Sequence, residues 1–473
     1  MLFNSITFLI FFPVVCLLYW LLTPRLRNGM LLIASYYFYM NWEPVYALLI
    51  LFSTVSTWGS GLLISRENRR QRQRLWLSLC IIVNLGILFI FKYFNFITES
   101  TFSLLQTLGL RMDVPHFTLL LPVGISFYTF QAIGYIIDVY RGKTPVEKSL
   151  FRYALFVAFF PQLVAGPIER SYNLLQQFLT THRFNGQEIV EGLKIMAFGY
   201  FMKLCIADNV SPYVDAVFNN LPHHNGTSVL LAAFFFTFQI FCDFSGYSMI
   251  AIGAARCMGF SLMQNFKQPY LSTSPKDFWH RWHISLSSWF SEYVYIPMGG
   301  NRCSKTRHMA NTMATMTLSG LWHGANCTFV VWGIYHGILV TVTNRLRNVV
   351  PPKIFAKFNL LRKTVNILVT FMLITIGWVF FRANSLSDAF MALKKMATEH
   401  GMLYNGAGLP TILLPLMLIG FLMLREMYVE YKWNIPLFNR TTLARDIIFT
   451  GLLVIVILLC GSFDGGQFIY FQF

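Results

Sequence analysis

The sequence predicts an all-α, polytopic integral membrane protein, and three observations lead to this fold class. Hydrophobic residues make up 55% of the 473 residues and charged residues only 12%, whereas a soluble domain carries about 25% charged residues. The mean hydropathy is +0.53. Apolar runs recur at about 20 residues, the length that crosses a bilayer core as a helix. We therefore expect about 11–12 transmembrane helices, with re-entrant and interfacial helices, in a single membrane domain over residues 1–473.

The individual spans follow from the apolar periodicity of the chain. Two of them are shorter than a full span, which predicts tilted or re-entrant segments. Residues 150–166 are also apolar, but Pro161 interrupts them, and we expect this segment to be re-entrant. The expected spans are roughly 3–22, 30–41, 45–65, 75–94, 118–140, 189–207, 228–252, 310–323, 326–344, 364–381, 409–424 and 447–462.

The distribution of basic residues predicts the topology. Residues 65–74 (SRENRRQRQR) carry five Arg and residues 253–309 carry seven Lys or Arg, whereas residues 208–227 carry none. Cytoplasmic loops of membrane proteins are enriched in Lys and Arg. We therefore expect a multi-pass protein of a bacterial inner membrane, with a periplasmic N-terminus. The net charge of +17 then reflects loops that face anionic lipid and does not indicate nucleic-acid binding.

Residues 265–303 form an amphipathic region that is not a clean span. Ser274 and Pro275 are typical of a helix start, and Phe278, Trp282, Leu286 and Trp289 form a stripe at helical spacing. Such a helix is expected to lie at the cytoplasmic interface. His280 and His283 are three residues apart and would share a helix face with Asp277. Because this trio has no obvious further ligand and no H-E-x-x-H pattern is present, we expect no metal site.

His323 lies in GLWHGAN (320–326), between apolar segments. Ionisable groups at membrane depth are costly and are often functional. A buried imidazole is expected to be uncharged near pH 7, and such an imidazole can act as a general base. Gly320 and Gly324 either leave room for a ligand or allow two helices to pack closely. His336 is a weaker candidate for a functional histidine. Since G-x-S-x-G and P-loop patterns are absent, any catalysis is expected to use histidine and an incoming thioester.

Two stretches together identify a family. DFWHRWHISLSSWF (277–290) and SGLWHGANCTFVVWGIYH (319–336) strongly resemble the membrane-bound O-acyltransferases, in particular the bacterial branch that contains the membrane subunit of alginate O-acetyltransferase. The resemblance runs nearly end to end and in register. Its further matches are LPVGISFYTFQAIGYIIDVYRG (121–142), FFPQLVAGPIER (159–170), CDFSGYSMIAIG (242–253), YIPMGGNR (295–302) and FIYFQF (468–473).

The resemblance implies a ring of helices around a central tunnel, with a catalytic region at about residues 265–340. It makes His323 the catalytic histidine. His283 occupies a second position at which other branches carry Asn or Asp, which suggests a polar positioning role. In alginate-type systems a separate periplasmic protein completes transfer to the polysaccharide, so the resemblance also implies a periplasmic partner and a polysaccharide acceptor.

Combined with the charge pattern, the resemblance suggests a complete reaction. Acetyl-CoA, or another acyl thioester, would approach from the cytoplasmic side as donor substrate, and no permanently bound cofactor is expected. His323 would act as general base or, alternatively, as a nucleophile that carries the acetyl group. Trp322 or Asn326 would stabilise the oxyanion. The candidate residues for the donor phosphates are Lys276, Arg281, Arg302 and Lys305.

Two other classes and several acceptors are open at the level of sequence. A transporter or channel would have charged residues in several spans or a repeat of two halves. Asp243 is one such residue, and no repeat is visible. A non-catalytic scaffold would leave His323 without a purpose. Among acceptors, alginate, another exopolysaccharide, cellulose and peptidoglycan are all compatible with the sequence, and the acyl chain length of the donor is equally open.

Overall fold

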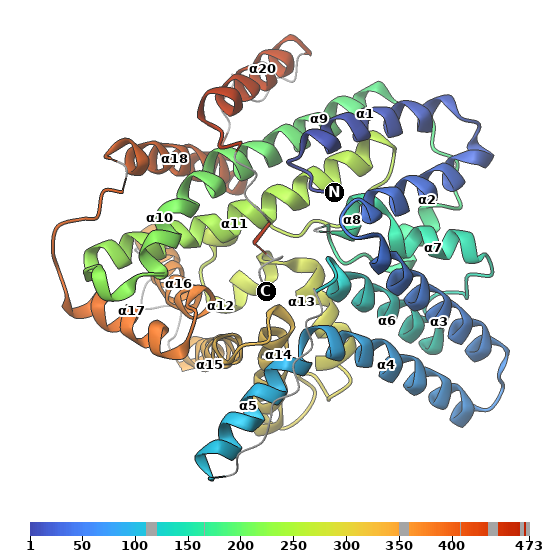
Figure 1. Ribbon diagram of the computed structural model, residues 1–473, viewed down its shortest axis with the longest axis horizontal. Coiled ribbons are helices and arrows are strands. Elements are labelled where there is room, and N and C mark those ends of the chain that lie inside the picture. Colours follow the sequence, from blue (N-terminus) through green and yellow to red (C-terminus); the bar gives the residue numbers. More distant parts are fainter. Residues whose placement is uncertain are drawn as a thin grey trace. The chain divides into compact units, whose positions relative to one another are not determined.

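The computed structural model describes residues 1–109, 121–164, 166–349, 359–406, 408–433, 443–463 and 468–469. In these residues the regular structure is helical (Figure 1), as the sequence predicts. The chain forms two compact units, residues 1–195 with 250–263 and residues 196–249 with 264–473. The single membrane domain over residues 1–473 stays a prediction.

The first unit is built mainly from the N-terminal helices, among which α3 packs against α4, α6 and α7. The apolar segment at residues 150–166 is broken, because α7 ends at Ala158 and α8 begins at Phe160 with Pro161 in its first turn. This confirms the predicted break, and the re-entrant course stays a prediction. The helices are α1 (Ile6–Leu21), α2 (Pro24–Met40), α3 (Ala47–Arg66), α4 (Arg70–Lys92), α5 (Phe94–Thr107), α6 (Ile125–Arg141), α7 (Leu150–Ala158), α8 (Phe160–Leu163) and α9 (Gly186–Tyr200), with the short helices η1 (Pro44–Tyr46) and η2 (Ser171–Leu175).

The second unit contains the histidines that the sequence singles out. Within it α14 packs against α15, which also contacts α12 and α16. The chain passes between the units within α9, within α11 and between Met263 and Gln264. The helices from here on are η3 (Phe201–Ala207), α10 (Asp208–Phe218), η4 (Leu221–His223), α11 (Gly226–Cys257), η5 (Pro269–Leu271), α12 (Pro275–Arg281), α13 (Ile284–Phe290), η6 (Ser291–Tyr295), α14 (Lys305–His323), α15 (Cys327–Val349), α16 (Asn359–Arg382), α17 (Leu386–Thr398), α18 (Pro410–Tyr431) and α20 (Leu443–Cys460).

Each of the twelve expected spans overlaps a helix, although residues 118–120 of one span lie outside the described residues. Among the described residues five segments are long and apolar enough to cross a membrane, namely 44–66, 70–92, 226–257, 360–382 and 410–431. Three shorter helices at 6–21, 327–343 and 448–460 are also apolar. Large side chains such as Ile10, Ile82 and Met372 are about two-thirds exposed, as expected for a lipid-facing surface. The protein is therefore a multi-pass membrane protein.

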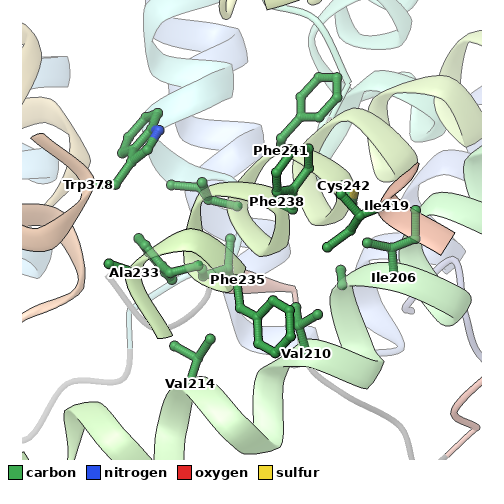
Figure 2. Close-up of a cluster of buried hydrophobic side chains, with 14 of the residues drawn as sticks. Ile206, Val210, Val214, Ala233, Phe235, Phe238, Phe241, Cys242, Trp378 and Ile419 are labelled. Atoms are coloured by element: carbon green, nitrogen blue, oxygen red, sulfur yellow. The ribbon is translucent and has the colours of Figure 1, made fainter. Parts of the chain in front are cut away.

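The spans differ in how much protein surrounds them. In the most apolar stretch of α11, 78% of the residues are buried, compared with 17% in α4. Figure 2 shows the cluster of buried side chains around α11, where Phe235, Phe238 and Phe241 face side chains from η3, α10, α16 and α18. Because α11 is largely apolar and mostly enclosed by protein, it forms the core element of the second unit.

Candidate active site around His283 and His323

His323 is held at the end of a tightly packed helix pair. It is the last residue of α14, and α15 begins four residues later at Cys327. A Cβ added at Gly320 would overlap the carbonyl oxygen of Phe329, and one added at Gly324 would overlap the Phe329 ring. These two glycines therefore allow close packing of α14 against the start of α15. The sequence left two roles open for these glycines, room for a ligand or close packing of two helices, and the structure confirms close packing.

His283 lies at a break between two short helices. Ser274 caps α12 by accepting a hydrogen bond from the Asp277 N–H at 3.2 Å, as predicted. However, α12 ends at Arg281 and α13 starts at Ile284, so the prediction that His280 and His283 share one helix face is wrong. His283 has φ of 42°, in the left-handed region. This conformation is costly for a residue with a Cβ, so the surrounding packing must impose it.

The two histidines lie in one buried cluster of aromatic rings, the histidine cluster, although they come from segments that are 40 residues apart in the sequence. Their ring centroids are 6.4 Å apart, and the side chains are 0% and 2% exposed. The Trp322 ring lies 5.7 Å from that of His283 and 5.1 Å from that of His323. Phe244 packs edge-on against His283 at 4.5 Å. Trp322 therefore contacts both imidazoles.

Burial determines the protonation state of His283. This residue lies between α12 and α13, neither of which is a candidate span. Loss of solvation lowers the pKa of its imidazole to about 3, because a dry environment disfavours the charged form. His283 is therefore neutral at physiological pH, and a neutral imidazole can both donate and accept one hydrogen bond.

A third histidine lies on the far side of Trp332. The Trp332 ring is 5.1 Å from the His323 ring and 4.8 Å from the His336 ring. His336 is fully buried, and neither of its ring nitrogens has a hydrogen-bond partner among the described residues. It packs against Trp279 at 5.2 Å. His336 is thus part of the aromatic packing that surrounds the histidine cluster.

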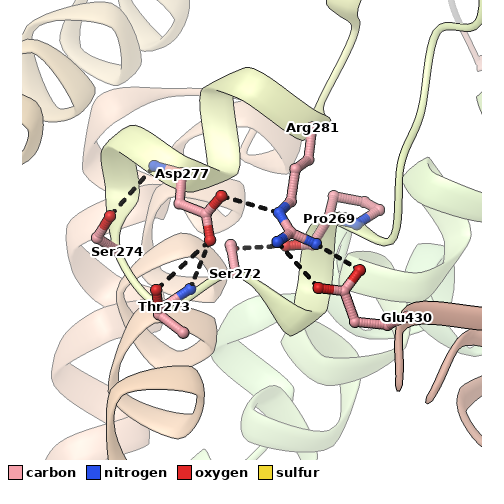
Figure 3. Close-up of polar contacts among 7 residues, drawn as sticks. All are labelled: Pro269, Ser272, Thr273, Ser274, Asp277, Arg281 and Glu430. Atoms are coloured by element: carbon pink, nitrogen blue, oxygen red, sulfur yellow. Dashed lines mark hydrogen bonds and ion pairs between the residues drawn. The ribbon is translucent and has the colours of Figure 1, made fainter. Parts of the chain in front are cut away.

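The basic residues that the sequence suggests for donor binding differ in their surroundings. Lys276, Arg302 and Lys305 are exposed. Arg281, in contrast, donates to Asp277 at 2.9 Å and makes a bidentate pair with Glu430 at 2.9 and 3.0 Å (Figure 3). Arg281 therefore ties the end of α12 to α18, and a phosphate would have to share it with two carboxylates.

The histidines and acidic residues do not form a metal-binding arrangement. His280 is exposed whereas His283 is buried beyond the helix break, and Asp277 is paired with Arg281. In the part of the chain that the structure describes, no three metal-ligating side chains converge.

A polar cavity of about 760 Å³ lies beside the histidine cluster within the second unit, since Phe381 lines the cavity and its ring lies 5.3 Å from the His323 ring. Lys203 lies at its wall and bridges Asp208 at 2.8 Å and Asp243 at 2.6 Å. Arg382 pairs with Asp215 at 2.7 Å. The complete lining is Lys203, Ala207, Asp208, Ser211, Asp215, Asn219, Gln239, Asp243, Ala325, Asn326, Thr328, Phe329, Phe381, Arg382, Ala383, Asn384 and Ile469.

The cavity also contains one of the two residues suggested for oxyanion stabilisation. Asn326 donates to the Asn384 carbonyl oxygen at 3.3 Å and accepts from the Thr328 N–H at 3.0 Å, whereas Trp322 touches both histidines. Sequence reasoning missed the cavity, since it treated Asp243 only as a possible transporter residue. Lys203, an ionisable residue in the expected span 189–207, was the signal that could have revealed it.

Comparison with known proteins adds a family and several relatives. A sequence model described as MBOAT, membrane-bound O-acyltransferase family, matches residues 144–385. The chain is 40% identical over 444 residues to the probable alginate O-acetylase AlgI of Pseudomonas aeruginosa, covering 92% of this chain and 83% of that protein. It is 34% identical over 447 residues to the peptidoglycan O-acetyltransferase of Helicobacter pylori, covering 85% and 81%. A more distant similarity, 30% over 232 residues, links it to the teichoic acid D-alanyltransferase of Bacillus subtilis, covering 47% and 58%.

Proposed function

The chain belongs to the membrane-bound O-acyltransferase family and is an O-acyltransferase, and on this premise we propose that it moves an acetyl group from acetyl-CoA across a bacterial inner membrane for O-acetylation of an exported polysaccharide. The observation that carries the proposal is the histidine cluster, in which the ring centroids of His283 and His323 lie 6.4 Å apart and the Trp322 ring contacts both. The names of the relatives support acetyl as the acyl group and alginate or peptidoglycan as the acceptor polymer.

In the proposed reaction the acceptor hydroxyl attacks the thioester carbonyl carbon. His323 takes the hydroxyl proton as general base, the carbon–sulfur bond breaks, and the departing thiolate receives the proton. Trp322 is the better placed of the two oxyanion donors, because it contacts both imidazoles. His283 orients the reacting groups as a neutral hydrogen-bonding side chain. In the alternative mechanism His323 itself carries the acetyl group, and the same residues of the histidine cluster are involved.

The two substrates arrive from opposite sides in this proposal. The basic residues of 253–309 face the cytoplasm, and Lys276, Arg302 and Lys305 bind the donor phosphates. Arg281 contributes chiefly by holding α12 in place, since Asp277 and Glu430 already bind it. A separate periplasmic protein completes transfer onto the polysaccharide.

Radiolabelled acetyl-CoA and purified protein test the proposal, with and without a periplasmic extract of the source cell. We expect His323→Ala to lower the initial transfer rate by about 10²–10⁴, the usual contribution of a positioned proton acceptor. His400→Ala is the matched control, because His400 is an exposed histidine outside the histidine cluster. A near-normal rate for His323→Ala at equal protein levels would show that the assigned chemistry is wrong.

A further inference from the structure

A buried carboxylate of α11 anchors a short segment, residues 468–469, from the far end of the chain. The backbone N–H of Ile469 donates to Asp243 Oδ2 at 2.6 Å, although the two residues are 226 positions apart. The other oxygen, Asp243 Oδ1, lies 2.6 Å from Lys203 Nζ. All three residues are buried. Because a buried N–H without an acceptor is costly, this hydrogen bond fixes where the 468–469 segment lies.

The cation that holds this carboxylate comes from an irregular helix. Lys203 lies in η3, a π-helix, and π-turns are rare and often occur at functional sites. The end of α20 is tied to the same place, because the Ser462 N–H donates to the Leu204 carbonyl oxygen at 3.0 Å. The Asn209 side chain, in the first turn of α10, donates to the Cys460 carbonyl oxygen at 2.8 Å. The region of η3 thus holds the end of α20 and, through Lys203, the anchor of the 468–469 segment.

The anchored segment reaches the histidine cluster through one aromatic ring. Phe468 is fully buried, and its ring lies 4.5 Å from that of Tyr247 and 5.9 Å from that of Phe244. The Phe244 ring packs edge-on against His283 at 4.5 Å. Phe244 therefore contacts the 468–469 segment and the histidine at the same time.

His283 depends on such support, because its backbone has φ of 42° and the surrounding packing must impose this conformation. Protein interiors are close-packed, and removing a buried ring leaves a void into which its neighbours can move. Without the Phe468 ring, Phe244 would be free to turn away from His283. A displacement of about 1 Å at a group that orients the reacting atoms can lower a rate by about 10².

We propose that Phe468 and Asp243 are positioning residues for His283. Asp243 fixes the 468–469 segment, Phe468 then supports Phe244, and Phe244 holds the His283 ring in its orientation. The proposal rests on the proposed function, in which His283 orients the reacting groups. It also gives a purpose to a buried ion pair between η3 and α11, since ionisable groups are costly at membrane depth.

Chemical protection of His283 tests this inference without any acetyl transfer. Diethyl pyrocarbonate modifies neutral imidazoles that it can reach, and mass spectrometry of the full-length protein in detergent measures each histidine separately. His283 is neutral near pH 7, so access limits its reaction, and the exposed His280 is the internal reference. We expect Phe468→Ala to raise the rate at His283 by about tenfold relative to His280, because the rate follows the fraction of time for which the ring is accessible. Phe468→Leu, which keeps most of the apolar volume, should give an intermediate rate.

A matched control separates positioning from general loss of stability. Phe235 is equally buried on α11, and its ring packs against Tyr213 and Phe234. Phe235→Ala should lower the unfolding temperature as Phe468→Ala does, but it should leave His283 protected. Thermal unfolding of each variant verifies that it is folded. Protection of His283 as complete as in the unaltered protein, in Phe468→Ala or, if that variant does not fold, in Phe468→Leu, would overturn the proposal.

The acetyl-transfer rate then connects the position of His283 to the reaction. We expect Phe468→Ala to lower kcat by about 10–10² and to leave the KM for acetyl-CoA within about twofold, with Phe468→Leu in between. Asp243→Val removes the acceptor for Ile469 while Asp208 keeps Lys203 paired, so it should act in the same direction, and Asp243→Asn, which keeps one oxygen, should act less. A normal kcat in Phe468→Ala would also overturn the proposal. Absence of transfer in the unaltered protein would instead contradict the proposed function.

Discussion

The left-handed backbone of His283 yields a stability order that is the reverse of the usual one. In an ordinary helix, replacing a residue with glycine is worse than replacing it with alanine by about 1 kcal/mol. At φ of 42° alanine bears the steric cost of its Cβ, about 1–2 kcal/mol, and glycine does not. Both variants remove the whole imidazole, so their cavities differ only by the methyl group of alanine. We therefore expect His283→Gly to be the more stable of the two by about 1 kcal/mol.

The assay is paired thermal unfolding of the purified variants in detergent, followed by tryptophan fluorescence, together with the initial acetyl-transfer rate. His280 provides the control, because it lies within α12 and is exposed, so His280→Ala should be more stable than His280→Gly. If His283→Ala proved as stable as His283→Gly while the control pair behaved normally, the imposed left-handed conformation would be refuted.

The transfer rate of a third variant separates backbone from side chain. Asparagine tolerates the left-handed region and keeps one hydrogen-bonding function of the imidazole. We expect His283→Asn to retain measurable activity and His283→Gly and His283→Ala to have less. Loss of activity in His283→Asn as complete as in His323→Ala would show that the two histidines act as one unit.

Three further predictions concern packing, the ion-pair network and the topology. Gly320→Ala should lower the unfolding free energy by about 1–3 kcal/mol through overpacking, whereas the control Gly59→Ala, with open space around its Cβ position, should not destabilise the protein. Equal effects of the two variants in thermal unfolding would contradict the α14–α15 packing. Arg281→Lys should destabilise by about 1–2 kcal/mol and leave the KM for acetyl-CoA within twofold, and a tenfold rise in KM would instead place Arg281 on the donor phosphates. For the topology, the exposed His223 is replaced by cysteine in a background whose native cysteines are changed to serine. This cysteine should react with an impermeant thiol reagent in intact spheroplasts. Reaction only after lysis would show that the topology is the reverse of the predicted one.

Much of the fold could be predicted from the sequence because it depends on local patterns. Apolar length and periodicity located all twelve expected spans on helices, since a helix that faces lipid needs only a continuous run of suitable residues. Ser274 and Pro275 predicted the start of α12 for the same reason, because a helix cap involves neighbours three residues away. The W-H-G stretch and its companion motifs identified the family.

The amino-acid pattern alone thus located the helices, identified a membrane protein and singled out His323 and His283. Three features became visible only once the chain was folded: the helix break at His283, the packing role of Gly320 and Gly324, and the cavity lined by Lys203, Asp208, Asp243 and Arg382. The difference lies in the range of the interactions. Hydrophobic periodicity is written in consecutive residues, whereas a close helix contact and a network of ion pairs depend on side chains from different helices, which only packing brings together.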